Sequence, residues 1–450
     1  MSLPRYSEYK DSGVVWLGKV PAHWDVCKFR HVFTESSEKI ETEVVGVMLS
    51  VSGYRGIEIK EYDDDNRRRL DEELIGYRIV RSGQLVVNTM WLNYAGLGVS
   101  NHEGHVSPAY RSYWIDPSFD KRYVHHMMRC DSFVRGYTKY LTGIRPNSLQ
   151  MSRDDLMAFQ LLSPPAEEQV AIATFLDRES AKIDALIAEQ EKLIALLTEK
   201  RQATISHAVT RGLNPDVPMK DSGVEWLGKV PAHWRFTRLK HIAHVQTGIA
   251  KGKDTSGKNT ITVPYLRVAN VQDGFLALDD VATIDIEAEQ LERYRLLPGD
   301  VLMNEGGDFD KLGRGAVWEG EIQDCIHQNH VFAVRPHSVD AAWLNQITSS
   351  QYAQFYFMGR SKQSTNLASI SSSNIMELPV LMPPASERAR ILTFVNFETT
   401  KLDALRTAAE HAITLLKERR NALITAAVTG KIDVRNAVTK LAEQTKEVAA

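Results

Sequence analysis

Residues 10–24 read KDSGVVWLGKVPAHW, and residues 220–234 read KDSGVEWLGKVPAHW. Across residues 10–31, fifteen of twenty-two positions are identical at an offset of 210 residues. A second repeat, at an offset of 219, joins residues 182–186 (KIDAL) to residues 401–405 (KLDAL). Chance does not produce such agreement. The chain is therefore a tandem duplication of two large units, each far longer than the repeat of a solenoid protein.

The segments between the repeats differ. Residues 32–150 and 242–369 show no readable similarity, and the second segment is nine residues longer, because 219 − 210 = 9. A constant frame therefore holds two different inserts. Such an arrangement suits a protein that recognises two different things at a fixed separation.

Composition predicts an ordinary globular protein, with 25% charged and 43% hydrophobic residues in 450 positions. Three cysteines without a CxxC pair argue against a disulfide framework or a cysteine zinc site and favour a reducing cytoplasm. The N-terminus lacks the apolar core of a signal peptide, and no apolar run reaches membrane length. We therefore expect a cytoplasmic protein without a membrane partner.

The net charge of −3 is not typical of a protein that binds nucleic acid unaided. No long segment of the chain is strongly basic. If the chain binds DNA, a partner is expected to supply much of the phosphate attraction that dominates affinity.

Two long helices are predicted, because Pro164-Pro165 and Pro383-Pro384 each precede a long apolar periodicity that ends near Gly212 and at Gly430. The apolar spacing of three and four residues predicts an antiparallel coiled coil between the two helices. In the alternative arrangement each helix packs only on its own lobe. The residues expected to pair the helices are Ile172, Leu176, Ile183, Leu186, Leu193, Leu197, Ile391, Val395, Leu402, Leu405 and Leu416.

The expected fold class is α+β, with two mixed α/β lobes related by a pseudo-two-fold axis and separated by the two antiparallel helices. β-Branched runs between turn signals predict strands at residues 43–51, 84–88, 262–268, 300–304 and 330–334. The predicted boundaries are lobe 1 at 1–163, helix 1 at 164–211, lobe 2 at 212–382, helix 2 at 383–430 and a C-terminal tail at 431–450.

Catalytic motifs are weak. Residues 94–98 (YAGLG) offer a glycine loop for a methyl donor, but without a clear strand-loop-helix setting, and residues 116–119 (DPSF) have serine where a methyltransferase motif usually has proline. Residues 58–60 (EIK) are too little for a nuclease site. His23 and His233 have no second metal ligand at a suitable spacing, so a structural role is predicted for both. No catalytic, cofactor-binding or metal-binding residue is expected.

Several motifs together resemble the specificity (S) subunits of type I restriction-modification systems. They are the duplicated segment at residues 10–24 and 220–234, PPAEEQ at 164–169, the KxDAL pair, LPGDVL at 297–302, GRG at 313–315, QNH at 328–330 and VTGKID at 428–433. The chain departs from the family pattern at 387–388, where Glu-Arg replaces Glu-Gln, and at 211–216. The resemblance covers nearly the whole chain.

The resemblance implies a function. Each lobe would be a target-recognition domain that reads one half of a bipartite sequence in double-stranded DNA. The paired helices would set the spacing and dock two methyltransferase subunits, and motor-nuclease subunits would complete the restriction enzyme. Adenine methylation, S-adenosylmethionine, ATP and magnesium would all belong to those partner subunits, so this chain would itself be non-catalytic.

Base recognition needs side chains that reach base edges: arginine and lysine pair with guanine, asparagine and glutamine with adenine. In lobe 1 the candidates are Tyr54, Arg55, Asn93, Tyr94, Arg145, Asn147 and Gln150. In lobe 2 they are Lys251, Lys253, Lys258, Asn259, Arg314, Lys362, Gln363, Thr365 and Asn366. Each could equally be a solvated loop residue.

Trp91, Trp318 and Trp343 are predicted to lie in the core rather than to stack on bases. Two other classes of protein stay open at this point. One is a scaffold that assembles proteins through its helices without reading DNA, and the other is a stand-alone modification enzyme.

Overall fold

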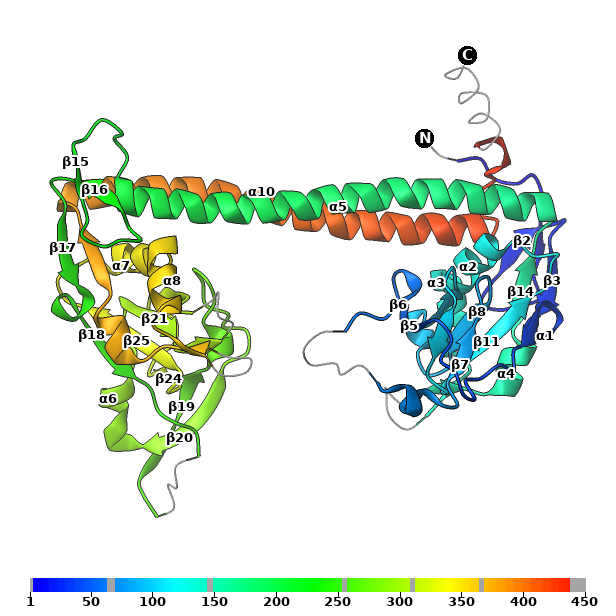
Figure 1. Ribbon diagram of the computed structural model, residues 1–450, viewed down its shortest axis with the longest axis horizontal. Helices are drawn as coiled ribbons and strands as arrows, with labels where there is room; N and C mark the ends of the chain where they lie inside the picture. The colour runs from blue at the N-terminus through cyan, green and yellow to red at the C-terminus, as the bar shows by residue number, and fades with distance from the viewer. Residues whose placement is uncertain are drawn as a thin grey trace. The chain divides into compact units, whose positions relative to one another are not determined.

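The computed structural model describes residues 3–62, 69–143, 149–252, 257–307, 312–363 and 368–437. The chain divides into two compact units (Figure 1): unit 1 comprises Met1–Gln190 with His411–Ala450, and unit 2 comprises Glu191–Glu410. Both divisions fall inside long helices, so each unit contains part of both. No helix among the described residues is long and apolar enough to cross a membrane.

The duplicated segment builds the same structure in both units. In unit 1, β1 (Tyr9–Asp11) pairs with β2 (Lys19–Pro21), and β3 (Asp25–Lys28) pairs with β14 (Gln160–Ser163). In unit 2, β15 (Met219–Asp221) pairs with β16 (Lys229–Pro231), and β17 (Arg235–Arg238) pairs with β28 (Pro379–Met382). All four pairs are antiparallel. The repeated sequence therefore connects the start of each lobe to its end.

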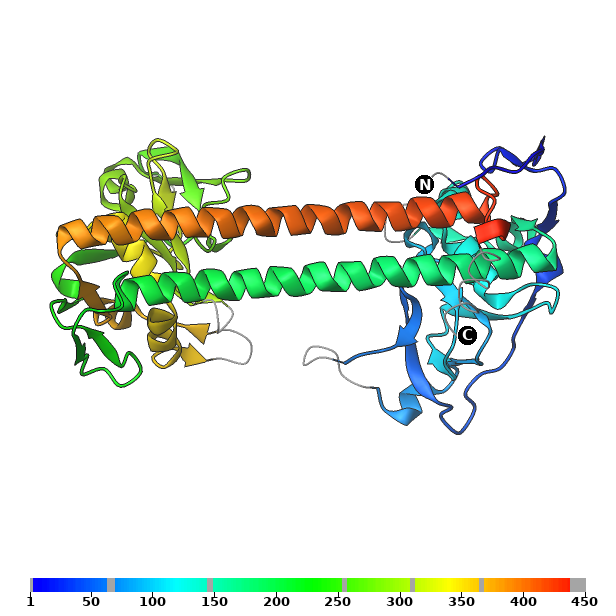
Figure 2. The same cartoon turned by 90° about the horizontal axis from the view of Figure 1, so that it is seen from above.

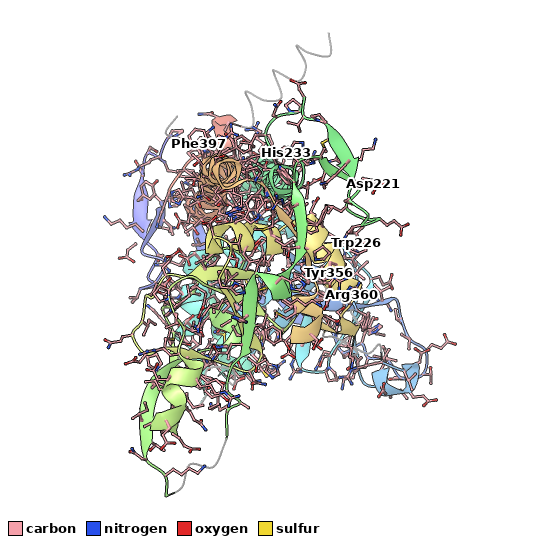
Figure 3. All side chains as sticks on the ribbon, turned by 90° about the vertical axis from the view of Figure 1, so that its left-hand side faces the viewer. Asp221, Trp226, His233, Tyr356, Arg360 and Phe397 are labelled. Atoms are coloured by element: carbon pink, nitrogen blue, oxygen red, sulfur yellow. The ribbon has the colours of Figure 1, made fainter. Side chains whose placement is uncertain are left out.

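The repeated tryptophans anchor this segment. Trp24 and Trp234 are fully buried. Trp16 stacks on Phe159 with ring centroids 5.1 Å apart. Its counterpart Trp226 lies 6.2 Å from the ring of Tyr356 (Figure 3). The large rings bury much apolar area, which explains why the repeat retains them.

The two inserts, which share no readable sequence, contain the same main sheet. Its strand order in unit 1 is β4 (Phe33–Glu35), β11 (Tyr110–Ile115), β8 (Leu85–Asn88) and β9 (Leu97–Val99). In unit 2 the order is β18 (Ala243–Thr247), β25 (Val331–Pro336), β21 (Asp300–Asn304) and β23 (Gly315–Trp318). All neighbours are antiparallel. The duplication thus extends through the inserts at the level of fold.

A second sheet in each unit contains one parallel pair. In unit 1 the order is β6 (Gly56–Ile59), β5 (Val47–Ser52), β10 (Gly104–Val106) and β7 (Arg78–Val80), with β5 and β10 parallel. In unit 2 it is β20 (Ala282–Glu287), β19 (Thr260–Leu266) and β24 (Ile326–His327), with β19 and β24 parallel. The smaller strands are β12 (Leu141–Thr142), β13 (Gln150–Met151), β22 (Gly306–Gly307), β26 (Lys362–Gln363) and β27 (Ala368–Ser369).

Short helices complete the lobes. They are α1 (Phe29–Val32), α2 (Lys121–Arg129), α3 (Asp131–Thr138) and α4 (Arg153–Ala158) in unit 1, and α6 (Leu291–Tyr294), α7 (Ala341–Thr348), α8 (Gln351–Met358) and α9 (Ser372–Met376) in unit 2. Polar N-caps begin several of them: the Asp120 carboxylate accepts hydrogen bonds from the backbone of α2, and Ser350 does so for α8. Short 3-10 turns lie at Asp71–Leu74, Leu92–Tyr94, Leu239–His241, Val268–Asn270 and Ala288–Gln290.

The two predicted long helices are present. α5 (Ala166–Arg211) has 46 residues and α10 (Ala385–Val428) has 44, and each follows its Pro-Pro pair directly. Gly212 at φ 74° and Gly430 at φ 71° follow them in the left-handed conformation that favours glycine at a helix end. In each unit a segment of α5 runs beside a segment of α10 (Figure 2). The pairing is antiparallel, because Asp184 contacts Arg420 in unit 1 and Arg201 contacts Asp403 in unit 2.

The predicted pairing residues differ in burial. Ile172, Leu176, Ile183, Leu197, Ile391, Val395 and Leu402 are buried as predicted, and Leu416 is half-buried. Leu186, Leu193 and Leu405 are 51%, 40% and 55% exposed, so burial does not support their predicted pairing role. Ile187 is buried instead of Leu186, and Ile194 is half-buried next to Leu193. Both choices satisfy spacings of three and four residues, and only the position of the partner helix decides between them.

Each lobe core includes residues of both long helices. In unit 1, Ile172 of α5 and Val428 of α10 belong to the cluster around Trp24. In unit 2, Val209 of α5 and Ile391 of α10 belong to the cluster around Trp234. The alternative in which each helix packs only on its own lobe is therefore wrong.

Candidate nucleic-acid interface

The two repeated histidines bind repeated glutamates. His23 Nε2 lies 2.6 Å from Glu168 Oε1, and His233 Nε2 lies 2.8 Å from Glu387 Oε2. The offsets are those of the repeats, because 23 + 210 = 233 and 168 + 219 = 387. Each pair fastens a repeated segment to the first turn of a long helix. Both contacts agree with the structural role predicted for the two histidines.

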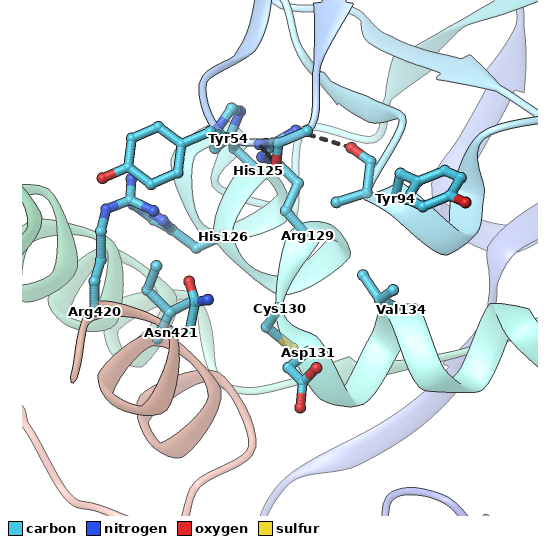
Figure 4. Close-up of a pocket in the computed structure, with 13 residues that line it drawn as sticks. Tyr54, Tyr94, His125, His126, Arg129, Cys130, Asp131, Val134, Arg420 and Asn421 are labelled. Carbon is cyan, nitrogen blue, oxygen red and sulfur yellow. Dashed lines mark hydrogen bonds between the residues drawn. The ribbon is translucent and has the colours of Figure 1, made fainter. Parts of the chain in front are cut away.

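A cleft in unit 1 brings two candidate loops against the long helices (Figure 4). Cleft 1 has a volume of about 250 Å³ and is lined by Gly53, Tyr54, Tyr94, Ala95, His125, His126, Arg129, Cys130, Asp131, Val134, Arg420, Asn421 and Ile424. Its lobe side consists of the β5–β6 turn, the loop between β8 and β9, and the junction of α2 with α3. Its helix side belongs to α10.

Arg129 holds the two loops together. Its guanidinium donates hydrogen bonds to the backbone oxygens of Gly53 at 2.9 Å and Ala95 at 3.1 Å, and to those of Ser52 and Leu97. Burial, with a contribution from the nearby charge of Arg420, lowers the pKa of Arg129 to about 10. Arg129 thus stays charged at neutral pH, and its donors are engaged by backbone oxygens of the protein.

The structure places Tyr54 against a helix. Its hydroxyl donates a hydrogen bond of 2.7 Å to Asp184 Oδ1, and the Arg420 guanidinium lies 4.8 Å from its ring centroid. Its phenol thus bonds to the protein, which does not favour the predicted role in reading a base. The neighbouring Arg55 is 73% exposed in its side chain and lies 2.7 Å from Glu58.

A buried histidine supports the same region. Burial, together with Arg129 and His126, lowers the pKa of His125 to about 3, so its Nδ1 accepts a hydrogen bond of 3.3 Å from the Val99 amide. Its ring needs glycine at position 56: a Cβ there would lie 2.7 Å from His125 Cε1. The tight β5–β6 turn and the histidine are therefore fitted to each other.

Next to cleft 1 lies a more open, basic hollow of about 440 Å³, to which Arg55, Lys121 and Arg122 contribute. Arg122 Nη1 lies 3.2 Å from Asp177. Burial raises the pKa of Asp177, but hydrogen bonds and charge from His126 and Arg122 outweigh it, and the net pKa is lowered. Sequence reasoning missed Lys121 and Arg122. The signal for them is the Asp120 N-cap, which places both residues in the first turn of α2 beside the lobe surface.

Unit 2 has a corresponding cleft, lined by three arginines and two aspartates. Cleft 2 has a volume of about 290 Å³ and is lined by Leu197, Thr198, Arg201, Gln202, Gln272, Asp273, Gly274, Phe275, Arg314, Leu402, Asp403 and Arg406. Arg201 and Gln202 correspond to Arg420 and Asn421 of cleft 1 at the offset of 219. Arg201 Nε lies 3.2 Å from Asp403, whereas Arg314, a predicted DNA contact, has no ion pair within the described residues.

The remaining candidates are dispersed. Tyr94, Gln150, Lys251, Lys258, Asn259 and Lys362 are exposed, and Asn93 is half-buried. Lys258 Nζ lies 2.8 Å from Glu287, and Gln150 Nε2 donates a weak hydrogen bond of 3.4 Å to Thr89. Gln363 belongs to β26. Arg145, Asn147, Lys253, Thr365 and Asn366 lie outside the described residues.

The tryptophan prediction is confirmed for two residues and wrong for one. Trp318 and Trp343 are fully buried, whereas Trp91 is 52% exposed. Trp91 lies edge-on to Tyr94 with ring centroids 6.1 Å apart, in the loop after β8. A loop residue has no periodicity that marks its burial, so the sequence could not show this exposed aromatic pair.

The weak enzyme motifs occupy ordinary structural positions. Gly96 lies between β8 and β9 and Gly98 lies within β9, which is followed by β10 rather than by the helix of a methyl-donor loop. Asp116 Oδ1 accepts a hydrogen bond of 2.9 Å from the Ser118 amide in the turn before α2. The described part of the chain contains no cluster of three or more histidine, cysteine or acidic residues suited to a metal.

Comparison with known proteins identifies relatives of one kind. No family model matches the chain. The EcoKI specificity subunit of a type I restriction enzyme from Escherichia coli K12 is 22% identical over 323 residues, covering 69% of this chain and 65% of the relative. The StySPI specificity subunit from Salmonella potsdam is 23% identical over 314 residues, with the same coverage of 69% and 65%. The chain spans less than two thirds of the length of these curated relatives.

A solved structure shares the fold. A chain from a type I R-M system, studied for its complex assembly and conformational transition, superposes with a TM-score of 0.60 at 16% identity. The superposition covers 91% of this chain and 98% of that chain. The fold is thus that of a component of type I restriction-modification systems. More particularly, the curated relatives are specificity subunits, and the resemblance predicted from the repeated motifs is confirmed.

Proposed function

We propose that this chain is the DNA sequence-specificity subunit of a type I restriction-modification complex, in which each lobe reads one half of a bipartite target. The observation that carries the proposal is that the two units share a frame and strand order, while the residues of their exposed loops differ. Equal scaffolds with unequal loops suit two half-sites of different sequence. The likeness to specificity subunits supports the same function.

The proposed DNA contacts divide by chemistry. Arg314 and Arg406 at cleft 2, and Arg55 with Lys121 near cleft 1, are suited to phosphates, because they are basic residues that line the hollows. The exposed pair Trp91 and Tyr94 is suited to apolar contact with bases or sugars.

The exposed leucines of the long helices are proposed to dock the methyltransferase subunits. Leu186 and Leu405 are 51% and 55% exposed, and Leu196 and Leu415 are 53% and 50% exposed. Both pairs are related by the offset of 219, so each unit offers the same apolar residues. Repeated exposed apolar side chains on a helix mark a surface that a partner covers.

The partners are proposed to carry the chemistry. Two methyltransferase subunits would bind S-adenosylmethionine, and motor-nuclease subunits would use ATP and magnesium. This chain would hold no cofactor and catalyse no step. Its contribution would be to place the methyltransferases on one DNA sequence.

The test is the pattern of DNA modification. The chain is co-expressed with its cognate methyltransferase in a host without other methylation, and modified bases are mapped by sequencing. A split, asymmetric motif with a fixed unread gap, absent without this chain, is the expected result. A stable complex that modifies no sequence would favour the scaffold, and methyl-donor binding by the isolated chain would favour a stand-alone enzyme.

Exchanging lobes sharpens the test. Replacement of residues 32–150 with the corresponding lobe of another specificity subunit is expected to change one half-site and leave the other unchanged. A change in both half-sites would contradict independent reading by the two lobes.

A further inference from the structure

One oppositely charged pair recurs between the long helices in both units. Arg420 Nε lies 3.3 Å from Asp184 Oδ1 in unit 1, and Arg201 Nε lies 3.2 Å from Asp403 Oδ1 in unit 2. Both aspartates belong to the KxDAL motif, and both arginines are related by the same offset, because 201 + 219 = 420. The repeat has therefore kept an interhelical ion pair.

The two pairs specify a single register. In an antiparallel pair the residue numbers at one level have a constant sum, and 184 + 420 and 201 + 403 both equal 604. Sliding one helix by a heptad would bring Asp184 opposite Ile413 or Ala427, neither of which is charged. Apolar seams alone tolerate such slides, whereas charged residues at fixed levels exclude them.

Burial makes these charges effective. The side chains of Arg420 and Arg201 are only 16% and 24% exposed, whereas those of Asp184 and Asp403 are 44% and 41% exposed, so the arginines are the buried partners. A largely buried guanidinium without its carboxylate carries a desolvation penalty, so the native register is favoured over every register that separates the pair. The ion pairs thus discriminate between registers, whatever their net contribution to stability.

Lobe 1 is attached to this register by Tyr54. The tyrosine hydroxyl bonds to Asp184 at 2.7 Å, and its ring lies under the guanidinium of Arg420 at 4.8 Å. Arg129 also holds the β5–β6 turn that carries Tyr54, through its hydrogen bond to the backbone oxygen of Gly53. In unit 2 the loop near Arg201 contains Gly274, where a Cβ would lie 3.3 Å from Arg201 Nη2. In lobe 2, therefore, the backbone at Gly274 rather than a tyrosine side chain lies close to the equivalent arginine, Arg201.

We propose that the Asp184–Arg420 and Asp403–Arg201 pairs fix the register of the helices, and that Tyr54 transmits this register to lobe 1. These residues act as positioning residues that determine how strictly the length of the unread gap in the DNA target is selected. The inference rests on the proposed function. It adds to that function the side chains that control one element of specificity.

The experiment measures methylation of targets whose gap is native, one base pair shorter or one base pair longer. Tyr54→Phe removes only the hydroxyl, and Asp184→Asn removes only the charge. Each variant weakens or removes a hydrogen bond to a charged group and is expected to lower the preference for the native gap by about tenfold or more. Glu189→Gln, at an exposed position of α5, is the control and is expected to keep the native preference.

Unchanged gap preference in both variants would overturn the proposal, as would uniformly reduced methylation at all three gaps, which is the result of a merely structural role. Asp184→Glu, which restores the charge, is expected to recover most of the preference lost in Asp184→Asn.

A second readout needs no methyltransferase. Amide exchange in the β5–β6 turn of the isolated full chain is expected to rise by about tenfold in Tyr54→Phe, because the turn loses its bond to α5. Unchanged exchange would overturn the coupling. A wild-type chain that directs no methylation would refute the proposed function instead, while the exchange result would still decide whether Tyr54 couples lobe 1 to the helix.

Discussion

The same repeated glutamate has different surroundings in unit 1 and unit 2. Glu168 accepts hydrogen bonds from Trp24 at 2.9 Å and Tyr6 at 3.1 Å, besides its contact with His23. Glu387 contacts His233, but Trp234 Nε1 has no partner within the described residues. Unit 1 adds Tyr6 and Arg435, which come from outside the repeated segments. Duplication preserved one ion pair, and terminal residues built a larger network around only one copy.

The two clefts differ in a related way. In cleft 1 the repeated Arg420 is engaged by Asp184 and Tyr54, so the lobe is attached to the helices. In cleft 2 the repeated Arg201 likewise contacts Asp403, and Arg314 and Arg406 line the cleft together with Asp273. One frame thus supports a lobe fastened by a tyrosine side chain in unit 1 and a cleft lined by a third arginine in unit 2.

The largest expected difference follows from the glutamates. Glu168→Ala leaves a buried indole N–H and a phenol without their acceptor, and we expect unit 1 to lose about 3 kcal/mol of stability. Glu387→Ala removes one histidine contact, and we expect unit 2 to lose about 1 kcal/mol. Amide exchange in β3 and β14, compared with β17 and β28, reports each unit separately. Equal losses of stability in the two units would contradict the inferred difference between the surroundings of Glu168 and Glu387.

Low pH should lower the folding stability of unit 1 through His125. Its pKa falls from 6.5 to about 3 on burial, so below pH 6.5 the unfolded chain binds a proton that the folded chain does not. Stability should therefore fall as the pH drops from about 6.5 towards about 3, by at most about 1.4 kcal/mol per pH unit. Amide exchange of β9 over this pH range, corrected for the intrinsic rate, measures the slope.

His125→Gln should flatten this dependence in unit 1. It should leave unit 2 unchanged, where burial also lowers the pKa of His327. His31→Gln, at an exposed position, is the matched control. A slope that persists in His125→Gln would assign the acid sensitivity to another group.

Local signals were sufficient for much of the fold. The Pro-Pro pairs and terminal glycines gave both long helices to within a few residues, because proline and glycine act on the backbone directly. The strand predicted at residues 300–304 coincides with β21, and the predictions at 84–88 and 330–334 overlap β8 and β25. Buried strands bounded by turns are readable because their apolar side chains are contiguous.

Features that depend on contacts between distant parts of the chain could not be predicted from the sequence. The shared sheet order of the two inserts depends on pairings between distant strands, which different sequences satisfy equally well. The leucines at 186 and 193 compete with the isoleucines at 187 and 194 for the same seam, and only the facing helix decides. Tyr54 was predicted to contact a base, because the sequence around a loop tyrosine does not indicate a carboxylate partner 130 positions away.

Substitution of the exposed leucines tests whether the two units bind methyltransferase subunits equally. Two double variants test the surface: Leu186→Ser with Leu415→Ser in unit 1, and Leu405→Ser with Leu196→Ser in unit 2. Each should weaken methyltransferase binding by about tenfold or more, because an apolar side chain contributes about 1.5–3 kcal/mol on burial. Folding stability should change by only about 0.5 kcal/mol, since these residues are exposed. Native mass spectrometry of the complex should show one methyltransferase lost from either double variant. A loss from one unit only would refute the equivalence of the two docking surfaces.

The smallest effect is expected from the arginines of cleft 2. Arg314→Ala and Arg406→Ala should each reduce the slope of log affinity against log salt by about 1, which corresponds to about 3.5-fold over a fourfold change in salt. The preferred sequence should not change, because a phosphate contact is equally available in every sequence. Salt titrations of DNA binding by the assembled methyltransferase complex measure the slope, with Arg390→Ala on an exposed part of α10 as the control. A changed motif with an unchanged slope would mean that Arg314 reads a base, and then this arginine of cleft 2 would serve recognition rather than attachment.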